Sequence, residues 1–184
     1  MKTKYISALL VTGAIAIGTS PAMADSSDTP ELNFSCQVTE GTPTTVVQSI
    51  GSEEKLPIFH WKKDALLLKS SASPQELCNS VSAKLEDYSA QGYDLSQISF
   101  VGTEQAGLPV ICANTAGGPE CNKVLLTLAA TEQPAIVADD VVTAILDQSL
   151  QKDKEVYQDR GVQSTSYQVS FWQLLGLNTK FFSK

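Results

Sequence analysis

Four cysteines are the residues of this sequence whose chemistry and spacing are most informative. They are Cys36, Cys78, Cys112 and Cys121. An even number of cysteines fits two disulfides in an oxidising compartment, and the sequence alone permits three connectivities. We favour the pairs Cys36–Cys78 and Cys112–Cys121. Four thiolates could instead hold zinc, but no Cys-x-x-Cys pair occurs and His60 is the only histidine.

His60 and the acidic pair Asp139 and Asp140 are the other candidates for a chemical site. His60 lies between Phe59 and Trp61 and has no catalytic partner close by in the sequence, so we expect it to be a surface or packing residue. The acidic pair could suggest a metal site, yet adjacent residues on a helix diverge by about 100°. We therefore expect both carboxylates to cap the positive N-terminus of a helix.

The sequence lacks the common catalytic motifs. It has no Gly-x-Ser-x-Gly elbow, no glycine-rich phosphate loop and no His-Glu-x-x-His zinc helix. Redox work of the thioredoxin type and haem attachment would each require a Cys-x-x-Cys pair. We therefore expect neither enzymatic activity nor a cofactor. The alternative is a small enzyme with a carboxylate-based site, because paired carboxylates can meet only in the fold.

The first residues have the order of an export signal. Lys2 and Lys4 precede an uncharged, mostly apolar run over residues 6–17 and a small-residue segment that ends at Ala24. This order predicts a signal peptide over residues 1–24. The apolar run is about a dozen residues long, which is short of the ~20 that a membrane-spanning helix needs.

The charge of the chain argues against nucleic acid as a partner. The sequence carries 20 acidic and 13 basic residues, for a net charge of −7. Loss of the predicted signal would leave 11 basic against 20 acidic side chains, and so a net charge of −9. A chain this acidic is repelled by phosphate backbones. The remaining length, about 160 residues, suits one domain with its tails.

Hydrophobic periodicity and turn residues predict six strands and two helices. The strands are expected over residues 32–38, 44–50, 56–61, 95–101, 108–113 and 124–129. The last two flank a Gly-Gly-Pro connection with a cysteine at each edge, so we expect a stapled hairpin over residues 107–128.

Both helices have an apolar stripe. Ser73-Pro74-Gln75-Glu76 is a capping box with proline at the first helical position, and Gly92 should end this helix. Its expected buried stripe is Leu77, Cys78, Val81, Leu85 and Tyr88. The second helix should begin near Asp139 and Asp140, and its expected buried stripe is Val141, Val142, Ile145, Leu146 and Leu150.

Together these elements predict a single α+β domain over residues 32–150. We expect an antiparallel sheet of about five to six strands, two helices packed on it, and two disulfides. Residues 25–31 should form a flexible lead-in. Residues 151–166 are charged and polar with few apolar residues, and we expect a polar linker there.

Residues 167–184 form an aromatic tail. Either this tail docks on the domain, which we favour, or it is an exposed contact for a membrane or a partner. The candidate contact residues are Phe171, Trp172, Leu174, Leu175, Phe181 and Phe182.

An ordered set of cysteines, glycines and apolar residues carries a family resemblance. Its members are Phe34, Cys36, Thr42-Pro43-Thr44-Thr45-Val46, Pro57-Ile58, Trp61, Cys78, Val81-Ser82, Gly92, Gly102, Gly107, Pro109-Val110-Ile111-Cys112, Cys121 and Leu125-Leu126-Thr127-Leu128. With this set, the chain resembles the circadian oscillating protein domain family of cyanobacteria. The family tends to have arginine before the helix cysteine and Arg-Phe after the Val-Ser pair, where this chain has Leu77 and Lys84-Leu85. No role for a cationic helix face is therefore carried over.

The resemblance implies an exported cyanobacterial protein of the periplasm or the thylakoid lumen, with membrane association as a further option. It supplies no catalytic residues. We therefore expect a non-enzymatic binding or protein-interaction module whose partner is an unknown protein or a membrane surface.

Overall fold

The computed structural model describes residues 31–66, 71–115, 120–159 and 162–176. The predicted signal peptide and residues 25–30 of the predicted lead-in lie outside this part of the chain. The elements are β1 (Leu32–Thr39), β2 (Thr42–Ser49), β3 (Lys55–His60), α1 (Lys63–Leu66), α2 (Pro74–Ala90), β4 (Gln97–Gln105), β5 (Leu108–Asn114), β6 (Lys123–Thr127), α3 (Pro134–Ile145), the 3₁₀ helix η1 (Gln148–Leu150), β7 (Lys154–Asp159), β8 (Val162–Ser170) and α4 (Phe171–Leu174).

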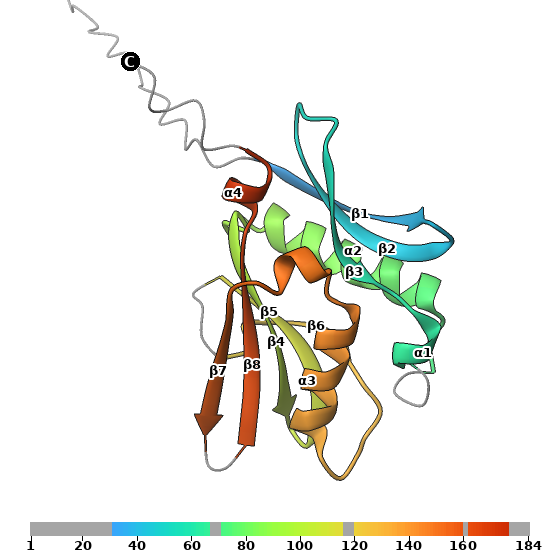
Figure 1. Ribbon diagram of the computed structural model, residues 1–184, viewed down its shortest axis with the longest axis vertical. Coiled ribbons are helices and arrows are strands. Elements are labelled where there is room, and N and C mark those ends of the chain that lie inside the picture. The colour runs from blue at the N-terminus through green and yellow to red at the C-terminus, as the bar shows by residue number, and fades with distance from the viewer. Residues whose placement is uncertain (1–30, 67–70, 116–119, 160–161, 177–184) are drawn as a thin grey trace, which may run out of the picture.

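The predicted α+β class is confirmed, and the strands divide into two antiparallel sheets (Figure 1). The first sheet has the order β1-β2-β3, and the second has the order β6-β5-β4-β8-β7. Helix α2 packs on β1 and β2, whereas α3 covers β4, β5 and β8. Phe59 of β3 meets Phe100 of β4 edge to face, with ring centroids 4.8 Å apart. The two sheets therefore share one core, although no strand pairing joins them in the described residues.

Helix α2 forms as its sequence predicts. Ser73 accepts a hydrogen bond from the backbone of Glu76 and the Glu76 carboxylate accepts one from the backbone of Ser73, which completes the capping box. The predicted stripe is buried, namely Leu77, Cys78, Val81, Leu85 and Tyr88. Gly92 has φ +85°, a left-handed conformation that favours glycine after a helix.

Helix α3 begins earlier than expected, with Pro134 in its first turn. Asp139 and Asp140 therefore lie in mid-helix, and the prediction that they cap an N-terminus is wrong. The Asp139 carboxylate instead accepts hydrogen bonds from the backbone and hydroxyl of Thr165, at 3.0 and 3.1 Å. Close packing underlies this contact, because a Cβ built on Gly102 would lie only 2.4 Å from the Ala138 carbonyl carbon.

The prediction of a polar linker over residues 151–166 is also wrong. Strand β7 and the first half of β8 occupy most of it, and β8 inserts between β4 and β7. The segment is polar because β7 is an edge strand whose side chains face solvent, from Lys154 to Val156. The inner face of β8 is apolar only further on, where Tyr167 and Val169 enter the core.

Candidate functional site

A polar cavity of about 540 Å³ lies between the turn that joins β1 to β2, the end of β3, and the C-terminal end of α3. It contains the only histidine of the sequence. Its lining is Thr39, Glu40, Thr42, His60, Lys62, Thr143, Ala144, Leu146, Asp147, Gln148 and Gln151. No local sequence pattern connects these residues, because they come from three separate segments.

The His60 ring is held between a carboxylate and a hydroxyl. Its Nε2 lies 2.7 Å from Oδ2 of Asp147, and its Nδ1 lies 3.4 Å from Oγ1 of Thr44. An ionised carboxylate can only accept, so we assign the ring proton to Nε2. His60 is partly exposed, in agreement with the expected surface or packing role, but its acidic partner was not foreseen.

The pKa of Asp147 is lowered. Burial alone would raise it, but hydrogen bonds from the Ser149 hydroxyl, from His60 and from the Ser149 backbone outweigh that effect. Oδ1 accepts from the Ser149 hydroxyl at 2.6 Å and from its backbone nitrogen at 2.8 Å. Asp147 is therefore an ionised acceptor at neutral pH and not a proton donor.

Thr44, His60 and Asp147 form a hydroxyl–imidazole–carboxylate series of the kind that nucleophilic hydrolases use. Two observations argue against catalysis here. Thr44 is fully buried, so no substrate can reach its hydroxyl. That hydroxyl also bonds the Thr42 carbonyl, at 3.1 Å. The series is better explained as a structural connection between β2, β3 and η1.

Both favoured disulfides are present. Cys36–Cys78 joins β1 to α2, and Cys112–Cys121 closes the β5–β6 hairpin across nine positions. All four cysteines are consumed, so the zinc interpretation is wrong. In the described part of the chain, no three His, Cys, Asp or Glu side chains are grouped so as to hold a metal ion.

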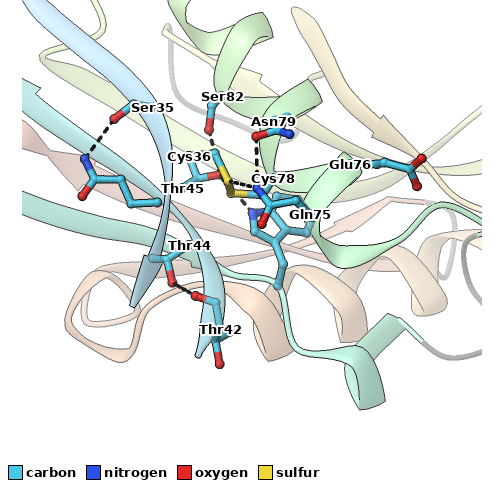
Figure 2. Close-up of a disulfide and its surroundings, with 12 residues drawn as sticks. Ser35, Cys36, Thr42, Thr44, Thr45, Gln75, Glu76, Cys78, Asn79 and Ser82 are labelled. Carbon is cyan, nitrogen blue, oxygen red and sulfur yellow. Dashed lines mark hydrogen bonds between the residues drawn. A yellow bond between two sulfur atoms is a disulfide. The ribbon is translucent and has the colours of Figure 1, made fainter. Parts of the chain in front are cut away.

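A small polar network lies in the core beside the Cys36–Cys78 disulfide (Figure 2). Thr45 Oγ1 accepts hydrogen bonds from Trp61 Nε1 at 3.0 Å and from Ser82 Oγ at 3.1 Å. Thr45 also lies 3.9 Å from the Cys78 sulfur, as a weak donor. One hydroxyl thus joins β2, the end of β3 and α2 at the disulfide.

The aromatic tail docks, at least in its first turn. Phe171 and Leu175 are buried, and the Phe171 ring packs edge to face on Phe34 with centroids 6.2 Å apart. These two residues are therefore core residues, and their assignment as partner or membrane contacts is wrong. Leu174 is 38% exposed and stays a candidate contact. The side chains of three candidates lie outside the described residues, namely Trp172, Phe181 and Phe182.

None of the helices that the structure describes is long and apolar enough to cross a bilayer.

One local sequence signal could have located part of the site. Asp147 followed by Ser149 is a typical start of a short helix, and the Asp147 side chain does cap η1. Nothing local could have paired Asp147 with His60, because 87 positions separate them.

Comparisons with known proteins give one match. No curated protein and no solved structure matches this chain significantly. A family model described as circadian oscillating protein COP23 matches residues 33–175, which is most of the chain and covers every described strand and helix except Leu32, the first residue of β1. The chain therefore belongs to the circadian oscillating protein COP23 family.

Proposed function

We propose that this chain is a non-enzymatic protein-interaction module that works in an oxidising compartment to which it is exported. The observation that carries the proposal is the hydrogen bond between His60 and Asp147 in the cavity. The single imidazole and its carboxylate bind each other, and the adjacent hydroxyl belongs to the fully buried Thr44. Asp147 occupies one ring nitrogen and the buried Thr44 hydroxyl lies against the other, so a substrate would have to displace one of these partners to exchange a proton with His60.

Two further observations support the location. Both disulfides suit the periplasm or the thylakoid lumen, because reducing compartments rarely keep structural disulfides. The predicted signal peptide would bring the chain there. Peripheral membrane association is part of the proposal only through the exposed Leu174 and the candidate residues Trp172, Phe181 and Phe182.

A small carboxylate-based enzyme is the alternative, because the cavity does gather Glu40 and Asp147. A general acid of that kind requires a raised pKa. The pKa of Asp147 is lowered instead. This difference favours binding over hydrolysis.

The test uses His60→Gln, since glutamine can still donate to Asp147 but cannot act as an acid or base. The mature protein, purified with its disulfides intact, would be cross-linked in exported and membrane fractions and analysed by quantitative mass spectrometry. We expect wild type and H60Q to give the same discrete set of cross-linked proteins. The proposal is overturned if wild type cross-links to nothing reproducibly, or if it turns over a substrate in a reaction that H60Q abolishes.

A further inference from the structure

The two sheets have four outer edges, and in an antiparallel sheet every second residue of an edge strand directs its N–H and C=O groups outward. Unpaired outward groups invite pairing with another chain. On three of these edges, a side chain or the backbone of a neighbouring element bonds an outward group. The fourth edge, that of β7, carries no such contact among the described residues.

Helix α2 bonds an outward backbone group on each of two edges, with side chains of opposite charge. On β1, the outward N–H of Phe34 donates to Oε2 of Glu86 at 2.7 Å. On β6, the outward carbonyl of Leu125 accepts from Nζ of Lys84 at 2.7 Å. Lys84 and Glu86 are two positions apart, so one turn of α2 satisfies an outward group on each sheet.

The segment after α3 contacts the third edge, that of β3. Leu146 forms an isolated antiparallel bridge with Phe59 of β3. The backbone N–H of Asp147 donates to the outward carbonyl of Ile58 at 2.8 Å, and the His60–Asp147 pair reinforces the contact from the side chains. A strand added at β3 would have to displace this segment.

The register of β7 shows which of its groups point outward. Gln168 N donates to Asp153 O at 2.8 Å, and the residue pairs that exchange hydrogen bonds recur at every second position from there. Glu155 and Tyr157 therefore bond to β8. Lys154 and Val156 direct their backbone groups away from the sheet, and Val156 is 55% exposed.

We propose that the outer edge of β7 binds an extended segment of another polypeptide, which adds to the second sheet as a sixth, antiparallel strand. The inference rests on the proposed interaction function and assigns the interaction to a specific edge of the second sheet. Strand addition supplies backbone hydrogen bonds for affinity and side-chain alternation for selectivity.

Charge favours another polypeptide over a second copy of this chain. Two antiparallel β7 strands can pair outward groups only in registers that place residues of the same parity opposite each other. Centred on Glu155, such a pairing sets Glu155 against itself; centred on Val156, it sets Asp153 against Asp159; centred on Tyr157, it sets Glu155 against Asp159. Each central register thus opposes acidic residues, and like charges directly opposite are destabilising.

The two faces of β7 define the chemistry of the partner. Side chains alternate between the two faces of the strand. The face away from α3 carries Asp153, Glu155 and Tyr157, and the α3 side carries Lys154 and Val156. A complementary strand carries basic residues opposite Asp153 and Glu155, an apolar β-branched residue opposite Val156, and an acidic residue opposite Lys154.

The probe is therefore the capped hexapeptide Thr-Thr-Val-Lys-Glu-Lys, which meets these requirements when it runs antiparallel to β7. Its control is the charge-reversed peptide Thr-Thr-Val-Glu-Lys-Glu. Both would be titrated into isotope-labelled mature protein and followed by NMR chemical shifts and amide hydrogen exchange. We expect the amides of Lys154 and Val156 to be protected at saturation, while those of Glu155 and Tyr157, already bonded to β8, do not change. The control peptide should bind at least about tenfold more weakly.

Val156→Pro removes the outward N–H without removing a bond to β8, and Val156→Thr keeps both the N–H and the branched side chain. We expect V156P to weaken peptide binding at least about tenfold and V156T to change it less than about threefold. Protection that is absent, or that spreads equally to Glu155 and Tyr157, overturns the proposal even if V156P fails to fold. Concentration-dependent dimerisation that V156P abolishes would identify a second copy as the occupant and also overturn it. If V156P keeps every cross-linked protein of wild type, the edge site is refuted and the interaction function stands.

Discussion

Thr45→Val tests the buried hydroxyl that joins β2, the end of β3 and α2. Valine keeps the branched shape and the strand preference of threonine, so the change acts mainly through the lost oxygen. Thr45 is fully buried. Without Oγ1, the Trp61 indole N–H, which bonds it at 3.0 Å, loses its only hydrogen-bond partner among the described residues.

The expected cost follows from that orphaned donor. A buried N–H left without a partner costs about 1–3 kcal/mol. The lost hydrogen bond from Ser82 adds little to this cost, because a serine within a helix can turn its hydroxyl to the carbonyl one turn earlier. We therefore expect T45V to lower the free energy of unfolding by about 2 kcal/mol, which in a domain of this size lowers Tm by about 4–8 °C.

The assay is urea unfolding followed by far-UV circular dichroism under non-reducing conditions, with Trp61→Phe and the double variant to complete a mutant cycle. Since W61F removes the donor, T45V should cost at least about 1 kcal/mol less in the W61F background than in wild type. A loss below about 0.5 kcal/mol in the single variant, or no coupling in the cycle, would refute the reasoning.

Three further predictions concern backbone packing, a disulfide and pH. Gly102→Ala should lower the free energy of unfolding by more than about 2 kcal/mol, because the new Cβ would force α3 away from β4 at Ala138, and thermal unfolding would show it. Replacing both Cys112 and Cys121 by serine should cost about 2.5 kcal/mol by loop entropy; an unchanged urea midpoint would contradict this. Asp147 has a lowered pKa in the folded state, so its stabilising effect is present at neutral pH and is lost as the pH falls below about 4. Asp147→Asn should therefore destabilise the protein more at pH 7 than at pH 3, and an equal loss at both pH values would show that the carboxylate charge is not involved.

Local chemistry explains which elements the sequence predicts well. The capping box of Ser73 and Glu76 defines the start of α2 with residues only three positions apart, and Gly92 marks its end. The six strands before residue 130 alternate or carry β-branched runs, and the structure has a strand at each of them. Among the three possible disulfide pairings, the sequence favours the observed one because a strand cysteine, Cys36, and a helix-stripe cysteine, Cys78, are both predicted to face the core.

The elements that the sequence misses depend on distant partners. Strand β7 is charged because it is an edge, and β8 is polar over its first half, so neither has the apolar alternation by which strands are recognised. The pair Asp139 and Asp140 resembles capping residues and so predicts too late a start for α3, whereas Pro134 is the better signal. His60 and Asp147 are brought together only by the docking of the α3–η1 junction on β3.

The insertion of β8 between β4 and β7 bears on how the protein is made. Strands β4 and β8 pair Gln97 with Ser170. The interior strand β8 is therefore synthesised more than sixty residues after its partner β4. Until it arrives, β4 exposes an unpaired edge to the surroundings. We expect a chain built this way to complete its fold slowly and only after synthesis of β8, because contacts distant in sequence must close large loops. We therefore expect the incomplete sheet to be prone to aggregation until β8 is available to pair with β4.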